Sequence, residues 1–291
     1  MRNYKTVRGF TLVELLVVIS IIAMLLAVLI PALNKARNIA RCVVCQSSIR
    51  QLAIAWTTYA TSNSGRLVGG YAGVSGTSNN PQITSDMWYS WVEAPSNESG
   101  TLVSFDGSSW ADAPLADKER GIKKGLLYSY VKTLDVYHCG GDPRLQDNKG
   151  KQPARRSYNI GAGMNAPWWY VKNAKMISQI RTPARRYVFV EATDSRGWNQ
   201  GCWDIDAKDN DRGLVWNNVV APWHYNRSNW GFADGHAETQ IWRDKRTITL
   251  ANIRDYSEQK GKIGWASKNN PDLLWIFDRR EYSPKREGES L

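Results

Sequence analysis

The sequence predicts an α+β fold in which a long N-terminal helix packs on a head domain of mainly antiparallel β-strands. Two patterns predict the helix: an apolar run at residues 10–30 and, after it, apolar residues at helical spacing as far as residue 60. Beyond residue 80, short strand-like runs bounded by turn residues predict the head. A chain of 291 residues is long enough to build this head around its own hydrophobic core.

Residues 10–30 are expected to span a membrane. Eighteen of these 21 residues are apolar, the exceptions being Thr11, Glu14 and Ser20. A helix of this length matches the roughly 30 Å hydrocarbon core of a bilayer. The run is too long for a secretory signal peptide, and no small-residue cleavage site closes it. Basic residues flank both ends, so charge leaves the orientation open.

The helical pattern continues beyond Pro31 as an amphipathic segment. Apolar residues recur at intervals of three or four at Cys42, Cys45, Ile49, Leu52, Trp56 and Tyr59. This spacing gathers them on one helix face, which is expected to pack against the head. The whole helix is predicted over residues 10–60, a length of about 75 Å. It should end before residues 61–80, where Gly, Ser and Asn supply 12 of the 20 positions.

The head domain is predicted over residues 81–278. Strands are expected at 187–192 and 213–220, and a hairpin at 229–242. Asp234-Gly235 in this hairpin suits a two-residue type I′ turn. Residues 279–291 are charged and poor in apolar side chains, which predicts a polar tail.

The net charge of +11 raises nucleic acid as a partner, because clustered Lys and Arg neutralise phosphates. Arg2, Lys5 and Arg8, however, lie in the first nine positions, and the other basic residues are scattered along the chain with acidic residues between them. There is no arginine-rich arm and no zinc-finger spacing. We expect no nucleic-acid binding.

The N-terminus resembles the prepilin motif of type IV pilins and type II secretion pseudopilins. A short basic leader ends at Gly9, Phe10 follows, and Glu14 comes four residues later. The resemblance implies a pilin-like fold and a leader at residues 1–9. It implies that a prepilin peptidase cuts between Gly9 and Phe10 and methylates the new amine of Phe10. It also implies that Glu14 pairs with the Phe10 amine of a neighbouring subunit, and a carboxylate in hydrocarbon needs such a partner.

The C-terminal half resembles the H-x9-D-G signature of a large group of prepilin-like proteins, at His224 and Asp234-Gly235. Cys139 and Glu191 are similar to landmarks that precede this signature in the group. His224 and Asp234 could be an acid–base pair or metal ligands. The favoured interpretation is a turn at Asp234-Gly235 with His224 bonded to a neighbouring loop. No nucleophile or phosphate-loop motif is present, so we expect no enzymatic activity.

The four cysteines favour a disulfide over a metal site. Cys42-x-x-Cys45 would suggest zinc if a second such pair followed, but Cys139 and Cys202 are isolated. A head translocated across a membrane meets an oxidising compartment. A disulfide from the helix to Cys139 is therefore expected, with Cys42 and Cys45 both open as its partner.

Two further features are weaker candidates for binding. Four carboxylates fall close together at Asp204, Asp206, Asp209 and Asp211, and could hold Ca²⁺, although a solvated acidic loop is favoured because the spacing is not that of an EF-hand. No other cofactor is expected. Trp168-Trp169-Tyr170 could form an exposed aromatic platform, although most of the 14 tryptophans are expected to fill the core.

These patterns predict a structural subunit of a type IV pilus-like or type II secretion-like filament. It would be anchored in the inner (cytoplasmic) membrane by one helix, with its head in the periplasm or outside the cell, and its partners would be the prepilin peptidase and other pilin-like subunits. The alternative is a singly anchored surface or periplasmic protein that binds glycan or secreted cargo and does not polymerise. A hydrolase using His224 and Asp234 has the least support.

Overall fold

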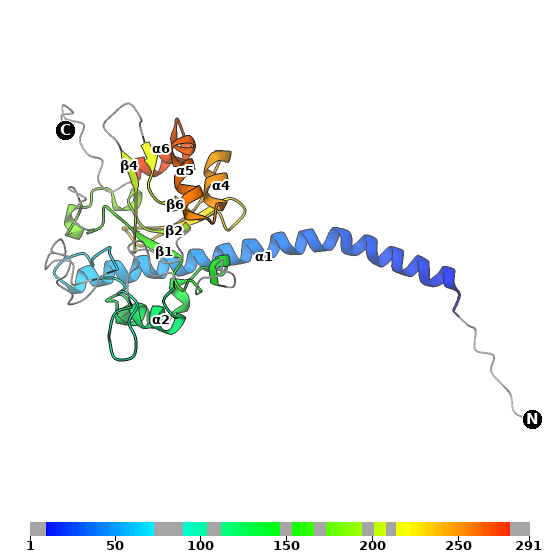
Figure 1. Cartoon of the computed structure of the whole chain (residues 1–291), viewed down its shortest axis with the longest axis horizontal. Coiled ribbons are helices and arrows are strands. Elements are labelled where there is room, and N and C mark those ends of the chain that lie inside the picture. The colour runs from blue at the N-terminus through cyan, green and yellow to red at the C-terminus, as the bar shows by residue number, and fades with distance from the viewer. Residues whose placement is uncertain are drawn as a thin grey trace, which may run out of the picture. The chain divides into compact units, whose positions relative to one another are not determined.

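The computed structural model describes residues 10–72, 90–103, 112–145, 153–165, 173–193, 201–207 and 214–279 (Figure 1). The chain divides into two compact units, Met1–Ala40 and Arg41–Leu291. Helix α1 (Leu12–Ser62) begins in the first unit and ends in the second. A long helix followed by a mostly antiparallel sheet and several shorter helices confirms the predicted α+β class.

In the first unit, α1 is the one helix among the described residues that is long and apolar enough to cross a membrane. Its most apolar window has a mean hydropathy of 3.1, and the side chains of this window are exposed. Pro31 lies inside the helix, where it removes one backbone hydrogen bond. These properties agree with a single-pass membrane anchor.

In the second unit, the main sheet has the strand order β3-β1-β2-β7-β8, and β6 also pairs with β2. Its strands are β1 (Tyr158–Gly161), β2 (Tyr187–Thr193), β3 (Cys202–Trp203), β6 (Val219–Val220), β7 (Arg227–Phe232) and β8 (Ala237–Ile241). All neighbours pair antiparallel except β1 and β3. A separate antiparallel pair is formed by β4 (Ile205–Ala207) and β5 (Leu214–Trp216).

One face of the sheet packs on α1. The predicted apolar stripe of this helix is buried, and Ile49, Leu52 and Trp56 are fully covered in one core with Phe189 of β2. Gly231 of β7 permits the close approach, because a Cβ at that position would lie 3.1 Å from the carbonyl oxygen of Ile49. Helices α2 (Leu115–Lys124) and α3 (Tyr128–Val131) contribute side chains to the same core.

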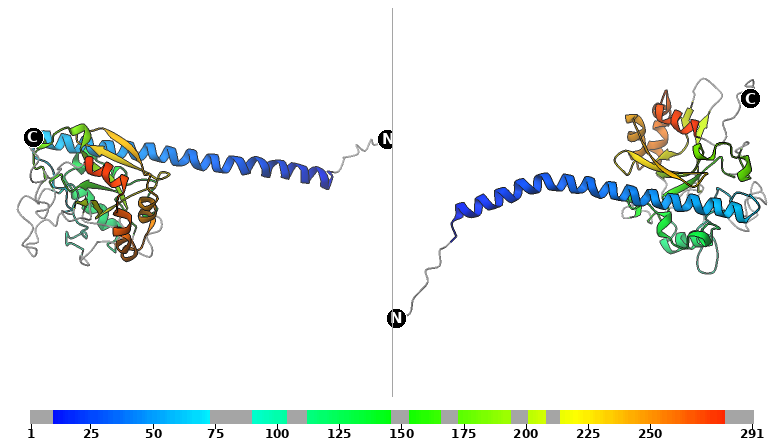
Figure 2. Two further views of the ribbon diagram at one scale, coloured as in Figure 1. Left: turned by 90° about the horizontal axis from the view of Figure 1, so that it is seen from above. Right: turned by 180° about the vertical axis from the view of Figure 1, so that it is seen from behind.

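The other face of the sheet carries a second core rich in tryptophan. Trp230 of β7 packs edge-on against Tyr187, Trp203, Trp242 and Trp275. This core is closed by three helices, α4 (Lys245–Asn252), α5 (Tyr256–Ser267) and α6 (Pro271–Asp278), which lie together on the side of the sheet away from α1 (Figure 2).

Three details differ from the sequence-based expectations. The region 213–220 holds two short strands, β5 and β6, in place of one. The hairpin turn is not type I′: Gly235 is its one residue with a left-handed φ, of 89°, and the Gly235 N–H donates to the Phe232 carbonyl, which suits a type I turn over residues 232–235. The helices α4 to α6 were not expected, although Asp244, Asp255 and Asn270 cap their N-termini with their side chains.

Candidate functional site

The described part of the N-terminal motif begins at Phe10, whose side chain is exposed. Thr11 and Glu14 form a reciprocal cap at the start of α1. The Thr11 backbone N–H donates to Glu14 Oε2 at 2.8 Å, and the Glu14 N–H donates to Thr11 Oγ1 at 3.2 Å. This is the capping-box arrangement, with Thr11 at the N-cap and Glu14 three residues later. Glu14 therefore also has a local structural role, in addition to the pairing with Phe10 that the prepilin resemblance implies.

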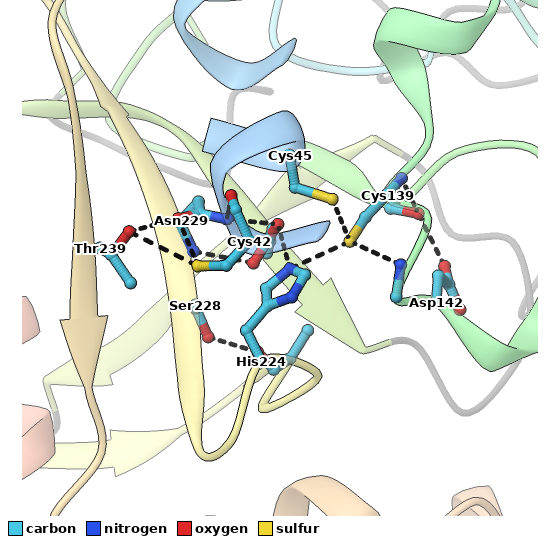
Figure 3. A network of polar contacts seen from close by, with 12 residues as sticks. Cys42, Cys45, Cys139, Asp142, His224, Ser228, Asn229 and Thr239 are labelled. Atoms are coloured by element: carbon cyan, nitrogen blue, oxygen red, sulfur yellow. Dashed lines mark hydrogen bonds and ion pairs between the residues drawn. The ribbon is translucent and has the colours of Figure 1, made fainter. Parts of the chain in front are cut away.

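A second site lies inside the head, where four side chains from distant segments meet (Figure 3). Cys45 comes from α1, and Cys139 follows the short 3₁₀ turn η2 (Asp135–Tyr137). Glu191 comes from β2, on the face that packs on α1, and His224 from the loop between β6 and β7. All four are buried, with exposed fractions of 2% or less. We call these four residues the buried cluster.

The donor atoms of the buried cluster lie within 4.8 Å of one another. The Sγ atoms of Cys45 and Cys139 are 2.7 Å apart. His224 Nε2 lies 3.2 Å from Cys139 Sγ and also 3.2 Å from Glu191 Oε1. One nitrogen atom of the imidazole thus faces a sulfur and a carboxylate oxygen at the same time.

Asn229 of β7 holds the Glu191 carboxylate in place. Its backbone N–H donates to Glu191 Oε2 at 2.8 Å, and its side-chain amide donates to Oε1 at 3.0 Å. The same amide donates to the carbonyl of Cys42, and the Thr239 hydroxyl donates to the Asn229 Oδ1. Cys42 Sγ contacts Asn229 and Thr239, as Figure 3 shows, and points away from Cys139.

The loop that carries Cys139 is fixed by a buried ion pair. Asp142 accepts hydrogen bonds from Arg144, the shortest at 2.7 Å, and from the Ser157 hydroxyl at 2.7 Å. Ser157 in turn accepts from the Cys139 backbone N–H. The Gly141 N–H donates to Cys139 Sγ at 3.2 Å. The bonds from Arg144 through Asp142 and Ser157 thus fix the backbone of Cys139, and the separate bond from Gly141 fixes its sulfur.

The charges of the buried cluster are coupled. The contact with the Cys139 thiol lowers the pKa of Cys45 to about 4, against the opposing effect of burial. Burial disfavours the charged form of His224, but contacts with the Cys45 sulfur and the Glu191 carboxylate outweigh it and raise the pKa of His224 to about 10. Burial raises the pKa of both Glu191 and Cys139. The arrangement favours a thiolate and an imidazolium side by side near neutral pH.

The structure brings together three residues of the H-x9-D-G resemblance, namely Cys139, Glu191 and His224, and adds Cys45 to them. Asp234 is not in this group. Its carboxylate accepts from the backbone N–H of His236 and lies 2.5 Å from His236 Nδ1, at the half-exposed hairpin turn. An acid–base pair of His224 and Asp234 is thus not among the described contacts.

Other predicted sites fall partly or wholly outside the described residues. Gly9, Asp209, Asp211 and the segment 168–170 lie outside them. Asp204 is buried and precedes β4, which contains Asp206. The calcium site therefore stays a prediction. The four cysteines are free in the structure, and the disulfide also stays a prediction, now narrowed to Cys45 and Cys139 because Cys42 points elsewhere.

Comparison with known proteins identifies the N-terminal segment. The family model of the prokaryotic N-terminal methylation motif matches residues 4–30, which is consistent with a type IV prepilin-like protein. No curated protein and no solved structure matches the chain. The match covers the predicted cleavage position between Gly9 and Phe10 and the apolar part of α1.

Proposed function

We propose that this chain is a prepilin-like subunit of a type IV pilus-like or type II secretion-like filament. The observation that carries the proposal is the N-terminal methylation motif at residues 4–30. The long apolar helix that follows it and the α+β head support the same function. In this proposal the chain is first a single-pass protein of the inner membrane, with its head in the periplasm or outside the cell.

Processing converts this precursor into a subunit that can assemble. A prepilin peptidase cuts between Gly9 and Phe10 and methylates the amine of Phe10. The apolar half of α1 then leaves the bilayer and packs among the equivalent helices of neighbouring subunits, where its exposed apolar side chains become buried. Glu14 faces the Phe10 amine of a neighbouring chain.

The head acts in this proposal without catalysing a reaction. A catalytic nucleophile must be reached by its substrate, whereas Cys45, Cys139 and His224 are at most 2% exposed. In a catalytic triad the acid orients the imidazole through the nitrogen that the nucleophile does not use. Here Glu191 and Cys139 both contact Nε2. The buried cluster is therefore better suited to hold the head together.

Mass spectrometry of the N-terminus tests the proposed processing. In cells that contain a prepilin peptidase, the chain isolated from membranes should begin with a methylated Phe10. Gly9→Leu should leave the precursor uncut, because a bulky side chain occupies the position that the peptidase must accept. An unprocessed wild-type terminus in such cells would contradict the proposal.

Assembly is tested separately by shearing the cells and examining the released material by electron microscopy and immunoblotting. Filaments that contain the processed chain are expected. A head that stays monomeric, keeps its leader and binds polysaccharide would support the singly anchored binding protein instead.

A further inference from the structure

Cys45, Cys139, Glu191 and His224 each contribute one possible ligand atom to the buried cluster, and these four atoms lie close enough together to surround one ion. Figure 3 shows Cys45, Cys139 and His224 side by side. The four residues come from a helix, a loop, a strand and a second loop. Hydrophobic packing alone gives no reason for two sulfurs, an imidazole and a carboxylate to converge in the interior. Buried groups of this kind need a partner that offsets their desolvation.

The hydrogen bonds within the buried cluster do not satisfy all of its polar atoms. An imidazole nitrogen carries either one hydrogen or one lone pair. On the imidazolium that the charges favour, the single Nε2–H must be shared between Glu191 Oε1 and Cys139 Sγ, each at 3.2 Å. Nδ1 of the same ring is buried and has no hydrogen-bond partner among the described residues. A cation between the four ligand atoms would let Nε2, the sulfurs and the carboxylate all act as lone-pair donors.

The surroundings also suit metal ligands. Ligating carboxylates are normally held by hydrogen bonds from neighbouring groups. Glu191 receives two such bonds from Asn229, at 2.8 and 3.0 Å, and Cys139 Sγ receives one from the Gly141 N–H at 3.2 Å. These bonds hold the Glu191 carboxylate and the Cys139 sulfur in place. Two sulfurs bound tetrahedrally to zinc at about 2.3 Å lie roughly 3.8 Å apart, so zinc binding requires the sulfurs of Cys45 and Cys139 to separate from their present 2.7 Å.

We propose that Cys45, Cys139, Glu191 and His224 form a structural zinc site that ties helix α1 to the sheet. Two thiolates, one imidazole and one carboxylate make a four-coordinate set of the kind that zinc accepts. Calcium and magnesium would require more oxygen ligands. The burial of all four residues leaves no side open to solvent, which is the mark of a structural site and not of a catalytic one.

The competing arrangement is a disulfide between Cys45 and Cys139, with His224 and Glu191 as a separate ion pair. It accounts for the sulfurs but leaves unexplained why His224 Nε2 lies 3.2 Å from Cys139 Sγ as well as from Glu191. The two arrangements differ in metal content and in the number of reactive thiols, so one preparation distinguishes them. Neither depends on filament assembly.

The test uses the full-length chain, extracted in detergent and purified without chelator or polyhistidine tag. Elemental analysis by mass spectrometry should find about one zinc ion per chain. X-ray absorption at the zinc edge should show two sulfur ligands at about 2.3 Å and two nitrogen or oxygen ligands at about 2.0 Å. Coordination by nitrogen and oxygen alone would overturn the proposal, and this readout needs no variant to fold.

Thiol counting completes the comparison. When the chain is unfolded in chelator without reductant, zinc coordination leaves all four cysteines reactive, whereas the disulfide leaves two. A chain that lacks zinc, and that takes up none after mild reduction and addition of zinc, overturns the proposal whichever thiol count it gives.

Variants locate the metal. Cys139→Ser and His224→Gln should each lower the affinity for zinc by about tenfold or more, because each removes one of the four ligands. Cys42→Ser is the matched control, because Cys42 is buried on the same face of α1 but contacts Asn229 and Thr239. It should retain zinc. If all three variants kept as much zinc as the wild type, the ion would bind elsewhere.

Discussion

Gly141 permits the closest approach in the loop that carries Cys139. A Cβ at this position would lie 3.0 Å from His224 Cε1, 3.3 Å from Trp223 Cβ and 3.4 Å from Cys139 Sγ. Gly140, its neighbour, has no heavy atom within 4 Å of the same constructed position. The two adjacent glycines therefore differ in what a methyl group would meet.

This difference predicts opposite effects of two alanine substitutions. Gly141→Ala should destabilise the head by about 1–3 kcal/mol, because the methyl group overpacks the interior beside His224. Gly140→Ala should be neutral or stabilise by a few tenths of a kcal/mol, through the lower entropy of the unfolded chain. Urea unfolding followed by tryptophan fluorescence measures both. Equal midpoints for the two variants would contradict the packing of Gly141 against His224.

Asp142 predicts part of the acid sensitivity of the head. Burial opposes its charged form, but Arg144 outweighs burial and holds the pKa of Asp142 below its ordinary value. A lowered folded-state pKa adds stability at pH values above the ordinary carboxyl pKa, and this stability is lost as the pH falls through the lowered value. Asp142→Asn leaves the Arg144 charge buried beside a neutral amide and should cost about 3–5 kcal/mol near neutral pH.

Unfolding free energies of wild type and Asp142→Asn at pH 7 and at about pH 2, below the ordinary carboxyl pKa, test this expectation. The difference between the two proteins should shrink as the pH falls. A difference that is constant over this range would show that the ion pair contributes little to the pH dependence.

At the residue scale, some members of the buried cluster could be predicted from the sequence, but their convergence could not. The resemblance points to Cys139 and His224, but the sequence disfavours zinc because no second Cys-x-x-Cys pair follows Cys42-x-x-Cys45. Such a spacing reveals a metal site only when the ligands are neighbours in sequence. Here the contacting residues are separated by 94, 85 and 33 positions, and only the fold brings them together.

At the scale of elements, the helix α1 was predictable and the last three helices were not. Helix α1 has both an apolar run and a long stripe of residues spaced by three and four, which the structure buries as expected. The helices α4, α5 and α6 are only 8 to 12 residues long, so their periodicity is short. Their signals were the capping residues Asp244, Asp255 and Asn270, with Pro271 at the first turn of α6.

The start of α1 gives Glu14 two separable roles. Its carboxylate accepts from Thr11 in the capping box, and in the proposed filament it also pairs with a Phe10 amine. Glu14→Gln keeps a side chain that can cap the helix but removes the charge. Thr11→Val keeps the shape of Thr11 and the charge of Glu14 but removes the hydroxyl from the cap.

We expect Glu14→Gln to be inserted and cleaved but to fail in assembly, because the buried amine loses its charged partner. Thr11→Val should assemble, with a loss of helix stability of about 1 kcal/mol. Sheared filaments and N-terminal mass spectra are compared for the two variants. Normal filaments from Glu14→Gln, with none from Thr11→Val, would assign Glu14 to helix capping alone.

At the scale of the second unit, the two cores share one sheet. Phe189 of β2 lies in the core beneath α1, and the next residue, Val190, lies in the tryptophan-rich core. Residues 41–291 form one compact unit. Since one strand supplies side chains to both cores, loss of either core removes the support of the other.

We therefore expect the head to unfold in a single cooperative transition. Trp56→Ala on the α1 side and Trp230→Ala on the opposite side should each destabilise it by about 3–5 kcal/mol, because both side chains are fully buried. Trp265→Ala is the control, since Trp265 is 53% exposed, and its effect should stay within about 0.5 kcal/mol.

Far-ultraviolet circular dichroism and tryptophan fluorescence are recorded during denaturant unfolding of each variant. The two signals should change together and shift together in both core variants. Two separate transitions, with Trp230→Ala moving one and Trp56→Ala the other, would show that the cores are independent despite the strand that they share.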